Sequence, residues 1–379
     1  MKSIYIILLI LLCFSCGEKS IESIKIGFIG PQTERVTNLG IAPSNAMQMA
    51  INIYNNSRKN NEPKIELYVE DDKWDDNLAI PLYTRLKKEQ DIDIIFISNS
   101  NGTLAIQNEI SRDNTVAINP LNNDAYLRNN TKNTFFIAKS TEQANQEIAK
   151  RIDQLKLNKT VIFHPPYNFY AVAAQAVKKE LEIYGNEAQI IETSIGQKDY
   201  RDYLELLKEE GYEAYCFFGY SEYGFAIKQA RDLGIEAPFF GCTEIQDEEF
   251  YEYSESNILG TEFSHFSRKD GNEALANTFF ENYKNQFSKE PNSDWPPMQA
   301  YDAMNIVIEI LRKVNESNVK KRDFSEWFKS ELSAVKNYYG VCGILNMENN
   351  NSISGINFTM YELVKKGKIQ RVNDKGNEM

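Results

Sequence analysis

The chain alternates short β-like runs with segments of helical period, and this order restricts the folds open to it. Residues 24–29, 64–69, 92–97 and 115–118 form the first four β-like runs. Between the first two, Met47, Ala50, Ile51 and Tyr54 recur at helical spacing and would share one face. Strands that alternate with helices form βαβ units, so this part of the chain predicts a parallel sheet covered by helices.

The same alternation repeats further along the chain with different residues. Strand-like runs occur at 160–163, 188–191, 213–218 and 237–240, and Gly211 and Gly234 stand where a glycine would end a helix. Long helices are expected at 274–287 and 298–314, and the tail at 356–372 predicts terminal strands. A chain of 379 residues exceeds the roughly 250–300 that one hydrophobic core serves. We therefore expect an α/β protein of two doubly wound, Rossmann-like lobes.

The first sixteen residues, MKSIYIILLILLCFSC, have the features of a lipoprotein signal peptide. Lys2 supplies a positive charge, residues 4–12 form an apolar stretch too short to span a bilayer, and Ser15 is the small residue before Cys16. The pattern predicts export and lipidation of Cys16, which would tether a globular protein to a membrane face. The alternative is an ordinary secretory signal peptide with an incidental cysteine.

The composition argues against several other classes of protein. The net charge is −12 and would become −13 on removal of the signal segment, because Lys2 is lost, so no nucleic-acid partner is expected. No apolar run after Cys16 approaches the ~20 residues of a membrane span. The remaining cysteines, Cys216, Cys242 and Cys342, are odd in number and lack metal-ligand spacing, so at most one disulfide can form. Cys216 and Cys242 lie in apolar strand-like runs, which predicts buried free thiols.

Seven short motifs follow one another over most of the chain. They are IKIGFIGP at 24–31, AMQMAIN at 46–52, KIELYVEDD at 64–72, FGY at 218–220, KQARDLG at 228–234, AYDA at 300–303 and KGK at 366–368. No single motif is specific, but an unrelated α/β protein would not match all of them in this order. Together they resemble the type I periplasmic binding proteins that serve branched-chain amino-acid ABC importers.

This resemblance implies a two-lobe clamp that closes on a small ligand by a hinge motion. Each lobe would be an α/β sandwich, and the chain would cross between the lobes three times, near residues 136–140, 261–267 and 343–347. The first lobe would comprise residues 23–138 and 265–345, and the second lobe residues 139–264 and 346–379. A monomer is the simplest expectation for such a clamp.

Ligand contacts on the first lobe are expected in the loops that follow two of its strands, because ligands bind beyond the carboxyl ends of parallel strands. The loop at 98–103 could hold a ligand carboxylate, or it could only cap the next helix. The loop at 119–124 has two amides where the family pattern has an alanine and a threonine, which weakens the expectation of a branched-chain amino acid. The candidates are Ser98, Ser100, Asn101, Thr103, Asn122 and Asn123.

On the second lobe, three residues are expected to contact the ligand. Tyr167 precedes a predicted helix, and Tyr220 follows the strand around Cys216 at a position where family members place an aromatic on the ligand. Glu244 is the candidate partner for a ligand ammonium, although it lies one residue later than the commonest family position. The alternatives are a surface aromatic for Tyr167 and a solvated carboxylate for Glu244.

Enzyme functions fit the sequence less well. The glycine-rich nucleotide loops are missing, and in GYSEYG at 219–224 the second glycine falls one place too late for a nucleophile elbow. His164 and His265 lie in different segments without partners at metal-ligand spacing. The acidic turn at 71–76 lacks the pattern of a calcium loop and is better explained as a helix cap. We expect no catalytic residue, cofactor or metal.

The sequence therefore predicts a lipid-anchored solute-binding protein of the cell envelope, facing the periplasm or held at the outer membrane. It would deliver a small polar, amino-acid-like ligand to the permease subunits of an ABC importer. Two alternatives keep the fold: a lipoprotein that activates cell-wall synthases through protein contacts, and a sensor subunit that passes cleft closure to a membrane receptor.

Overall fold

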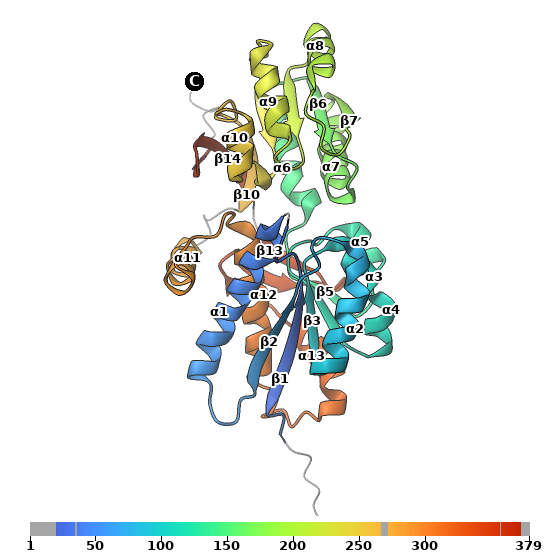
Figure 1. Ribbon diagram of the computed structural model, residues 1–379, viewed down its shortest axis with the longest axis vertical. Coiled ribbons are helices and arrows are strands. Elements are labelled where there is room, and N and C mark those ends of the chain that lie inside the picture. The colour runs from blue at the N-terminus through green and yellow to red at the C-terminus, as the bar shows by residue number, and fades with distance from the viewer. Residues whose placement is uncertain (1–19, 35, 267–271, 357, 373–379) are drawn as a thin grey trace, which may run out of the picture.

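The computed structural model describes residues 20–34, 36–266, 272–356 and 358–372, and it shows two α/β lobes stacked along the long axis of the molecule (Figure 1). The predicted signal peptide and Cys16 lie outside these residues. None of the helices in the described ranges has both the length and the apolar character that crossing a bilayer requires.

The first lobe contains a five-stranded parallel sheet in the order β2-β1-β3-β4-β5. Its pairing extends from Ser23 opposite Lys64 to Ile29 opposite Glu70 in the two longest strands. The four strands predicted from the sequence are all present, within two residues at each end. The bounds are β1 Ser23–Ile29, β2 Lys64–Glu70, β3 Ile94–Ile97, β4 Val116–Asn119 and β5 Thr134–Phe136.

Helices cover both faces of this sheet, as the βαβ order predicts (Figure 1). On one face, α1 (Ile41–Ser57), α12 (Trp295–Leu311) and α13 (Phe324–Ser333) bury their apolar sides against β1, β3 and β4. On the other face, α2 (Ala79–Gln90) and α4 (Gln107–Arg112) pack beside the short helix α3 (Ser100–Ala105). The short helix α5 (Ala125–Asn129) precedes β5.

The second lobe has a seven-stranded sheet in the order β15-β14-β10-β9-β8-β6-β7, parallel except where β14 and β15 are added antiparallel at one edge. The tail strands predicted at 356–372 are therefore confirmed. The bounds are β6 Lys159–His164, β7 Glu187–Glu192, β8 Ala214–Phe217, β9 Phe239–Gly241, β10 Glu262–Phe266, β14 Phe358–Lys365 and β15 Lys368–Arg371.

The helices of the second lobe also form two layers. One layer is α6 (Thr141–Gln154) with α7 (Asn168–Tyr184), and the other is α8 (Arg201–Glu209), α9 (Tyr223–Asp232) and α10 (Glu248–Tyr253). Gly211 and Gly234 follow α8 and α9 with φ values of 74° and 71°, the left-handed backbone that ends a helix. Cys216 and Cys242 are buried free thiols, as expected, and so is Cys342.

The last crossing between the lobes lies later in the chain than the predicted 343–347. The small antiparallel sheet of β11 (Tyr338–Gly340), β12 (Gly343–Met347) and β13 (Ile353–Ile356) places Leu345, Met347 and Ile353 in the core of the first lobe. The chain joins the second sheet only with β14, so it crosses after Ile356. The helix α11 (Glu273–Phe287) packs with residues of α1.

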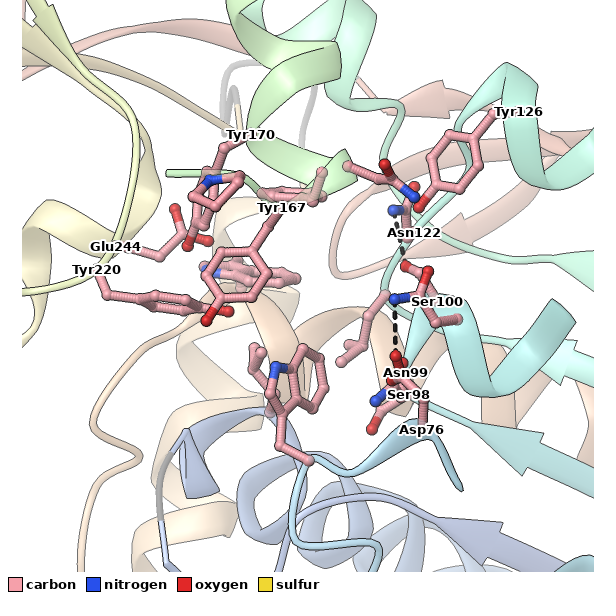
Figure 2. Close-up of a pocket in the computed structure, with 18 residues that line it drawn as sticks. Asp76, Ser98, Asn99, Ser100, Asn122, Tyr126, Tyr167, Tyr170, Tyr220 and Glu244 are labelled. Atoms are coloured by element: carbon pink, nitrogen blue, oxygen red, sulfur yellow. Dashed lines mark hydrogen bonds between the residues drawn. The ribbon is translucent and has the colours of Figure 1, made fainter. Parts of the chain in front are cut away.

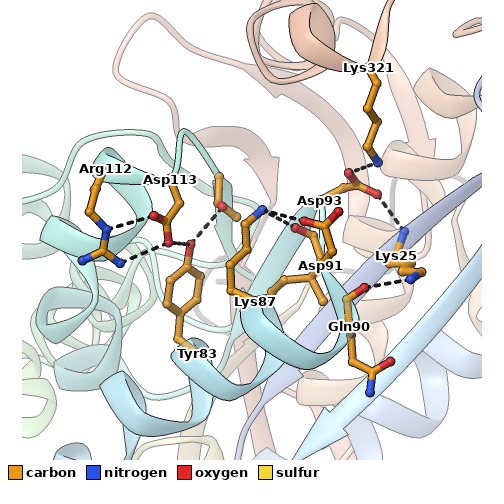
Figure 3. A network of polar contacts seen from close by, with 11 residues as sticks. Lys25, Tyr83, Lys87, Gln90, Asp91, Asp93, Arg112, Asp113 and Lys321 are labelled. Atoms are coloured by element: carbon orange, nitrogen blue, oxygen red, sulfur yellow. Dashed lines mark hydrogen bonds and ion pairs between the residues drawn. The ribbon is translucent and has the colours of Figure 1, made fainter.

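A network of charged side chains joins elements at the amino ends of β1 and β3 (Figure 3). Asp93 accepts a hydrogen bond from the Lys25 backbone N–H at 3.0 Å and pairs with Lys321 of the short helix η4 (Lys321–Asp323). The Lys25 Nζ donates to the Gln90 carbonyl at 2.8 Å. Ligands of open parallel sheets bind at the carboxyl ends of strands, so this network belongs to the opposite edge.

Candidate functional site

A cavity of about 260 Å³ lies between the two lobes, where the carboxyl ends of β3, β4, β6 and β8 lead into loops (Figure 2). The first lobe contributes mainly polar side chains, and the second lobe mainly aromatic ones. The lining residues are Leu39, Trp74, Asp76, Ser98, Asn99, Ser100, Asn101, Leu121, Asn122, Tyr126 and Trp295 from the first lobe, and Pro166, Tyr167, Asn168, Phe169, Tyr170, Tyr220 and Glu244 from the second.

The polar wall is held in shape by its own hydrogen bonds. Asn99 caps α3 by accepting from the Gly102 backbone N–H at 3.1 Å, and Asn122 donates to Ser100 Oγ at 3.0 Å. The Ser98 hydroxyl is different, because it is buried and finds no hydrogen-bond partner among the described residues. A buried hydroxyl without a partner is costly, so Ser98 is available to a ligand.

Two of the predicted contact residues, Thr103 and Asn123, lie outside the cavity and support the loops instead. The Thr103 hydroxyl donates to the Asn99 carbonyl one helical turn earlier at 2.8 Å, and it accepts from Asn119 at 3.0 Å. Asn123 donates to the Ile353 carbonyl at 3.1 Å. In both cases a backbone carbonyl, local for Thr103 and distant in sequence for Asn123, satisfies the side chain that the sequence pattern assigned to a ligand.

The aromatic wall consists of tyrosines that contact one another edge to face. The ring of Tyr220 lies 5.8 Å from that of Tyr167 and 5.2 Å from that of Tyr170. Burial raises the pKa of Tyr220, and the nearby Glu244 raises it further. These rings form an aromatic surface beside the Glu244 carboxylate.

Glu244 is only 7% exposed and lies in the short helix η3 (Thr243–Gln246). Its Oε2 accepts from the Thr243 hydroxyl at 3.3 Å, and that hydroxyl accepts from Lys139 Nζ at 3.1 Å. Lys139 is 5% exposed and stands 4.0 Å above the Trp295 ring. Burial lowers the pKa of Lys139, and the Glu244 charge opposes that effect. A buried carboxylate among aromatic rings is a suitable partner for a cationic group.

The family model of the periplasmic binding proteins matches residues 23–368, which is most of the chain. The chain belongs to the periplasmic binding protein family. Members of this family bind solutes and are not enzymes, in agreement with the lack of catalytic motifs.

Individual relatives of this periplasmic binding protein are distant in sequence but match it over most of their length. The leucine-, isoleucine-, valine-, threonine- and alanine-binding protein of Pseudomonas aeruginosa is 22% identical over 356 residues, covering 92% of each chain.

Two solved structures show the same fold. One is the branched-chain amino acid transporter substrate-binding protein LivJ of Streptococcus pneumoniae in complex with isoleucine, with a TM-score of 0.78 and 21% identity over 92% of this chain and 98% of that one. The other is a leucine-binding protein of Thermotoga maritima, with a TM-score of 0.79 and 18% identity over the same shares of the two chains.

Sequence reasoning about this periplasmic binding protein missed several lining residues, of which Trp74 and Asp76 are the most informative. The sequence of the acidic turn at 71–76 predicts only a helix cap, and Asp75 does cap the short helix η2 (Asp76–Leu78) by accepting from the Asn77 N–H at 3.0 Å. The same turn also delivers Trp74 to the cavity. Lys73 and Trp74 have φ values of 52° and 60°, which turns the loop toward the other lobe.

The described residues contain no group of three His, Cys, Asp or Glu side chains that could hold a metal ion. His265 pairs instead with Asp294 at 2.8 Å, and the His164 ring lies 2.8 Å from the Pro165 carbonyl. Each histidine ring thus has a polar partner within the fold, and these contacts explain its position without a metal ion.

Proposed function

We propose that this protein is a lipid-anchored solute receptor that traps a small polar, amino-acid-like ligand between its lobes for an ABC importer. The observation that carries the proposal is the buried Glu244 carboxylate in a cavity that both lobes line. An ammonium group bound there would meet a charge partner inside an aromatic enclosure. The contact residues would be Ser98, Ser100, Asn101, Asn122, Tyr167, Tyr220 and Glu244.

The relatives support this proposal. The Pseudomonas aeruginosa protein is described as binding leucine, isoleucine, valine, threonine and alanine, and the Streptococcus pneumoniae structure holds isoleucine. The cavity of about 260 Å³ is at or below the low end of the roughly 300–1,000 Å³ of small-molecule sites, which fits a small metabolite. Asn122 brings an amide to the wall, and this difference from the family pattern weakens the expectation of a branched-chain amino acid.

The anchoring and transport parts of the proposal rest on the sequence. Cys16 follows a signal-peptide pattern, so we propose that it carries the lipid and that the clamp works on the outer side of the membrane. The ligand-loaded clamp would then dock on permease subunits as a monomer.

Thermal unfolding of a soluble form that starts at Gly17 tests the receptor function, using a panel of amino acids, amides, amines and short carboxylates. A ligand at 100 times its dissociation constant stabilises a one-site protein by about 2.7 kcal/mol, a shift of several degrees in Tm. Glu244→Gln should weaken binding about 30-fold or more, because removing one partner of a buried charge pair costs about 2–5 kcal/mol.

The exposed Glu249 on the same lobe provides the matched control. Its carboxylate contacts Ser221 at 2.9 Å, outside the cavity, so Glu249→Gln should leave binding unchanged. A folded protein that responds to no compound of the panel would contradict the receptor function and favour an activator that works through protein contacts.

A further inference from the structure

The charged side chains that line the cavity are all acidic. Two carboxylates, Asp76 and Glu244, line it, and within the described ranges no lysine or arginine does. Figure 2 shows the two acids at opposite sides, Glu244 with the tyrosines of the second lobe and Asp76 beside Ser98 and Asn99 of the first. A ligand that fills the cavity therefore lies between two negative charges.

One of these charges has a nearby cation and the other does not. Lys139 lies behind Glu244, joined to it through the Thr243 hydroxyl. Asp76 accepts a hydrogen bond from Asn101 Nδ2 at 2.8 Å, but no lysine or arginine of the described chain lies within 4.0 Å of its carboxylate. Even with Lys139 counted, the site keeps one uncompensated negative charge.

Asp76 is also not the residue that caps η2. Asp75 already caps η2, and Asp71 binds the facing loop by accepting from the Gln32 N–H at 2.7 Å. Asp76 contributes its carboxylate to the cavity edge, next to Trp74. The position of Asp76 is therefore explained better by a ligand than by helix capping.

The aromatic walls suit positive groups as well. Trp74 of the first lobe and Tyr220 of the second line the same cavity and lie close to each other. Trp74, Tyr167, Tyr170 and Tyr220 thus enclose the space between the two carboxylates. Ring faces attract ammonium and guanidinium groups, and more strongly so where water is excluded.

We propose that the cleft selects a ligand with net positive charge, in which one cationic nitrogen meets Glu244 and a second meets Asp76. This inference rests on the proposed receptor function and specifies its substrate class. The shared chemistry is two cationic nitrogens on an aliphatic chain, as in an amino acid with an amine or guanidine side chain, or in a diamine. A neutral zwitterion would leave the Asp76 carboxylate unpaired in the closed site.

Isothermal titration calorimetry with L-lysine and L-norleucine tests the charge directly, because the two differ only in the terminal ammonium. A diaminoalkane of the same length, which lacks the carboxylate, distinguishes a diamine site from an amino-acid site. We expect lysine or the diamine to bind at least about tenfold more tightly than norleucine, and this preference to decrease with added salt.

The variant Asp76→Asn keeps the hydrogen bond from Asn101 and removes only the charge. It should abolish the preference for lysine or the diamine by weakening their binding, and norleucine should bind at least as tightly as to the wild type, because no unpaired carboxylate is left in the closed site. The matched control is Asp75→Asn on the same turn, where asparagine still caps η2 and the side chain does not line the cavity. This control should bind like the wild type.

Two results would count against the inference in different ways. Norleucine or leucine binding as tightly as lysine, with Asp76→Asn without effect, would overturn the cationic ligand and leave the receptor function intact. A folded wild-type protein that binds none of the zwitterions, basic amino acids or diamines would overturn the receptor function and the inference together. Circular dichroism of both variants would show whether a loss of binding comes from a loss of fold.

Discussion

Lys139 is a buried cation in the segment that connects the lobes between β5 and α6. It touches both of them, because its Nζ bonds Thr243 of the second lobe and lies over the Trp295 ring of the first. Its backbone N–H also bonds Gln299 of α12. Lys139 thus links the segment between the lobes, through the Thr243 hydroxyl, to the Glu244 carboxylate that we propose binds the ligand.

Lys139→Met should lower the free energy of unfolding by about 1–3 kcal/mol, because it leaves the Thr243 hydroxyl and the Glu244 charge without their buried partner. Urea unfolding followed by circular dichroism measures this loss. Lys132 precedes β5 and is exposed, so it serves as the control. The free energy of unfolding of Lys132→Met should stay within about 0.5 kcal/mol of the wild-type value. Equal stability of the two variants would refute a structural role for Lys139.

Asp247 follows η3, and its Oδ1 is buried without a hydrogen-bond partner in the described chain. Burial, with the neighbouring Glu244 and Glu249 charges, raises its pKa to about 8. The fold therefore favours the protonated Asp247 carboxyl. The stability that this preference gives the folded state is fully present below the ordinary Asp pKa of about 4, and it is lost as the pH rises to about 8.

Asp247→Asn should therefore flatten the decrease of Tm between pH 5 and pH 8, since asparagine cannot ionise. Thermal unfolding across that range, compared with wild type, provides the measurement. Asp199 is exposed and pairs with Arg201, so Asp199→Asn should keep the wild-type slope. An unchanged slope in Asp247→Asn would show that the Asp247 carboxyl titrates normally.

At the scale of elements, the small sheet of β12 and β13 depends on a close backbone approach. Gly355 has a φ of 93°, and a Cβ there would lie 1.8 Å from the Ile344 carbonyl oxygen. Gly355→Ala should therefore destabilise the protein by about 2 kcal/mol or more, because both the backbone angle and the contact are unfavourable for alanine. Gly185→Ala is the comparison, since Gly185 shares the positive φ but has open space around it. Similar Tm losses in the two variants would mean that the contact is unimportant.

The sequence predicted the elements whose period is strong and local. Strands such as β1 and β2 are continuous apolar or alternating runs, and the helix caps at Gly211 and Gly234 carry their own signal. The predicted position of the third crossing is wrong because β12 has the same alternation whichever lobe it joins. Two tertiary contacts decide its lobe: Ser352, just before β13, pairs with Phe136 of β5, and Leu345 and Met347 of β12 pack in the core that contains α12. Register and lobe membership are properties of tertiary packing, which a single sequence does not encode locally.

The candidate site was predicted where side chains follow strands directly, as at Ser98, Tyr220 and Glu244. The sequence does not distinguish the roles of Ser100 and Thr103, because both are hydroxyl residues in the same turn of helix. In the structure Ser100 lines the cavity, whereas the Thr103 hydroxyl donates to the Asn99 carbonyl. Trp74 was missed because its orientation depends on two consecutive left-handed residues in a turn without glycine.

At the scale of the whole molecule, the cavity is lined by residues of both lobes, so we expect the site to depend on how closely the lobes approach each other. Trp74 and Tyr220 meet across the cleft, and Asp124 of the first lobe accepts from the Thr141 N–H of the second at 2.8 Å. A ligand that contacts both walls stabilises the closed arrangement by its differential affinity for it. Hinge residues between β5 and α6 can supply the motion.

Small-angle X-ray scattering should show a smaller radius of gyration when the wild-type protein is saturated with its ligand. Glu244→Gln at the same ligand concentration should keep the larger radius, because its weaker binding leaves more molecules open. A radius that does not change while calorimetry shows full binding would mean that the clamp is already closed without ligand.

The order of elements along the chain has a consequence for biosynthesis. One face of the first sheet is covered by α1 together with α12 and α13, and these last two helices begin only at Trp295. The second sheet is completed only by β14 and β15, which follow β13. Most of the polypeptide must therefore be synthesised before either lobe can bury all of its apolar surface. Truncation before Trp295 leaves both halves incomplete, so a nonsense mutation in this region yields no functional lobe.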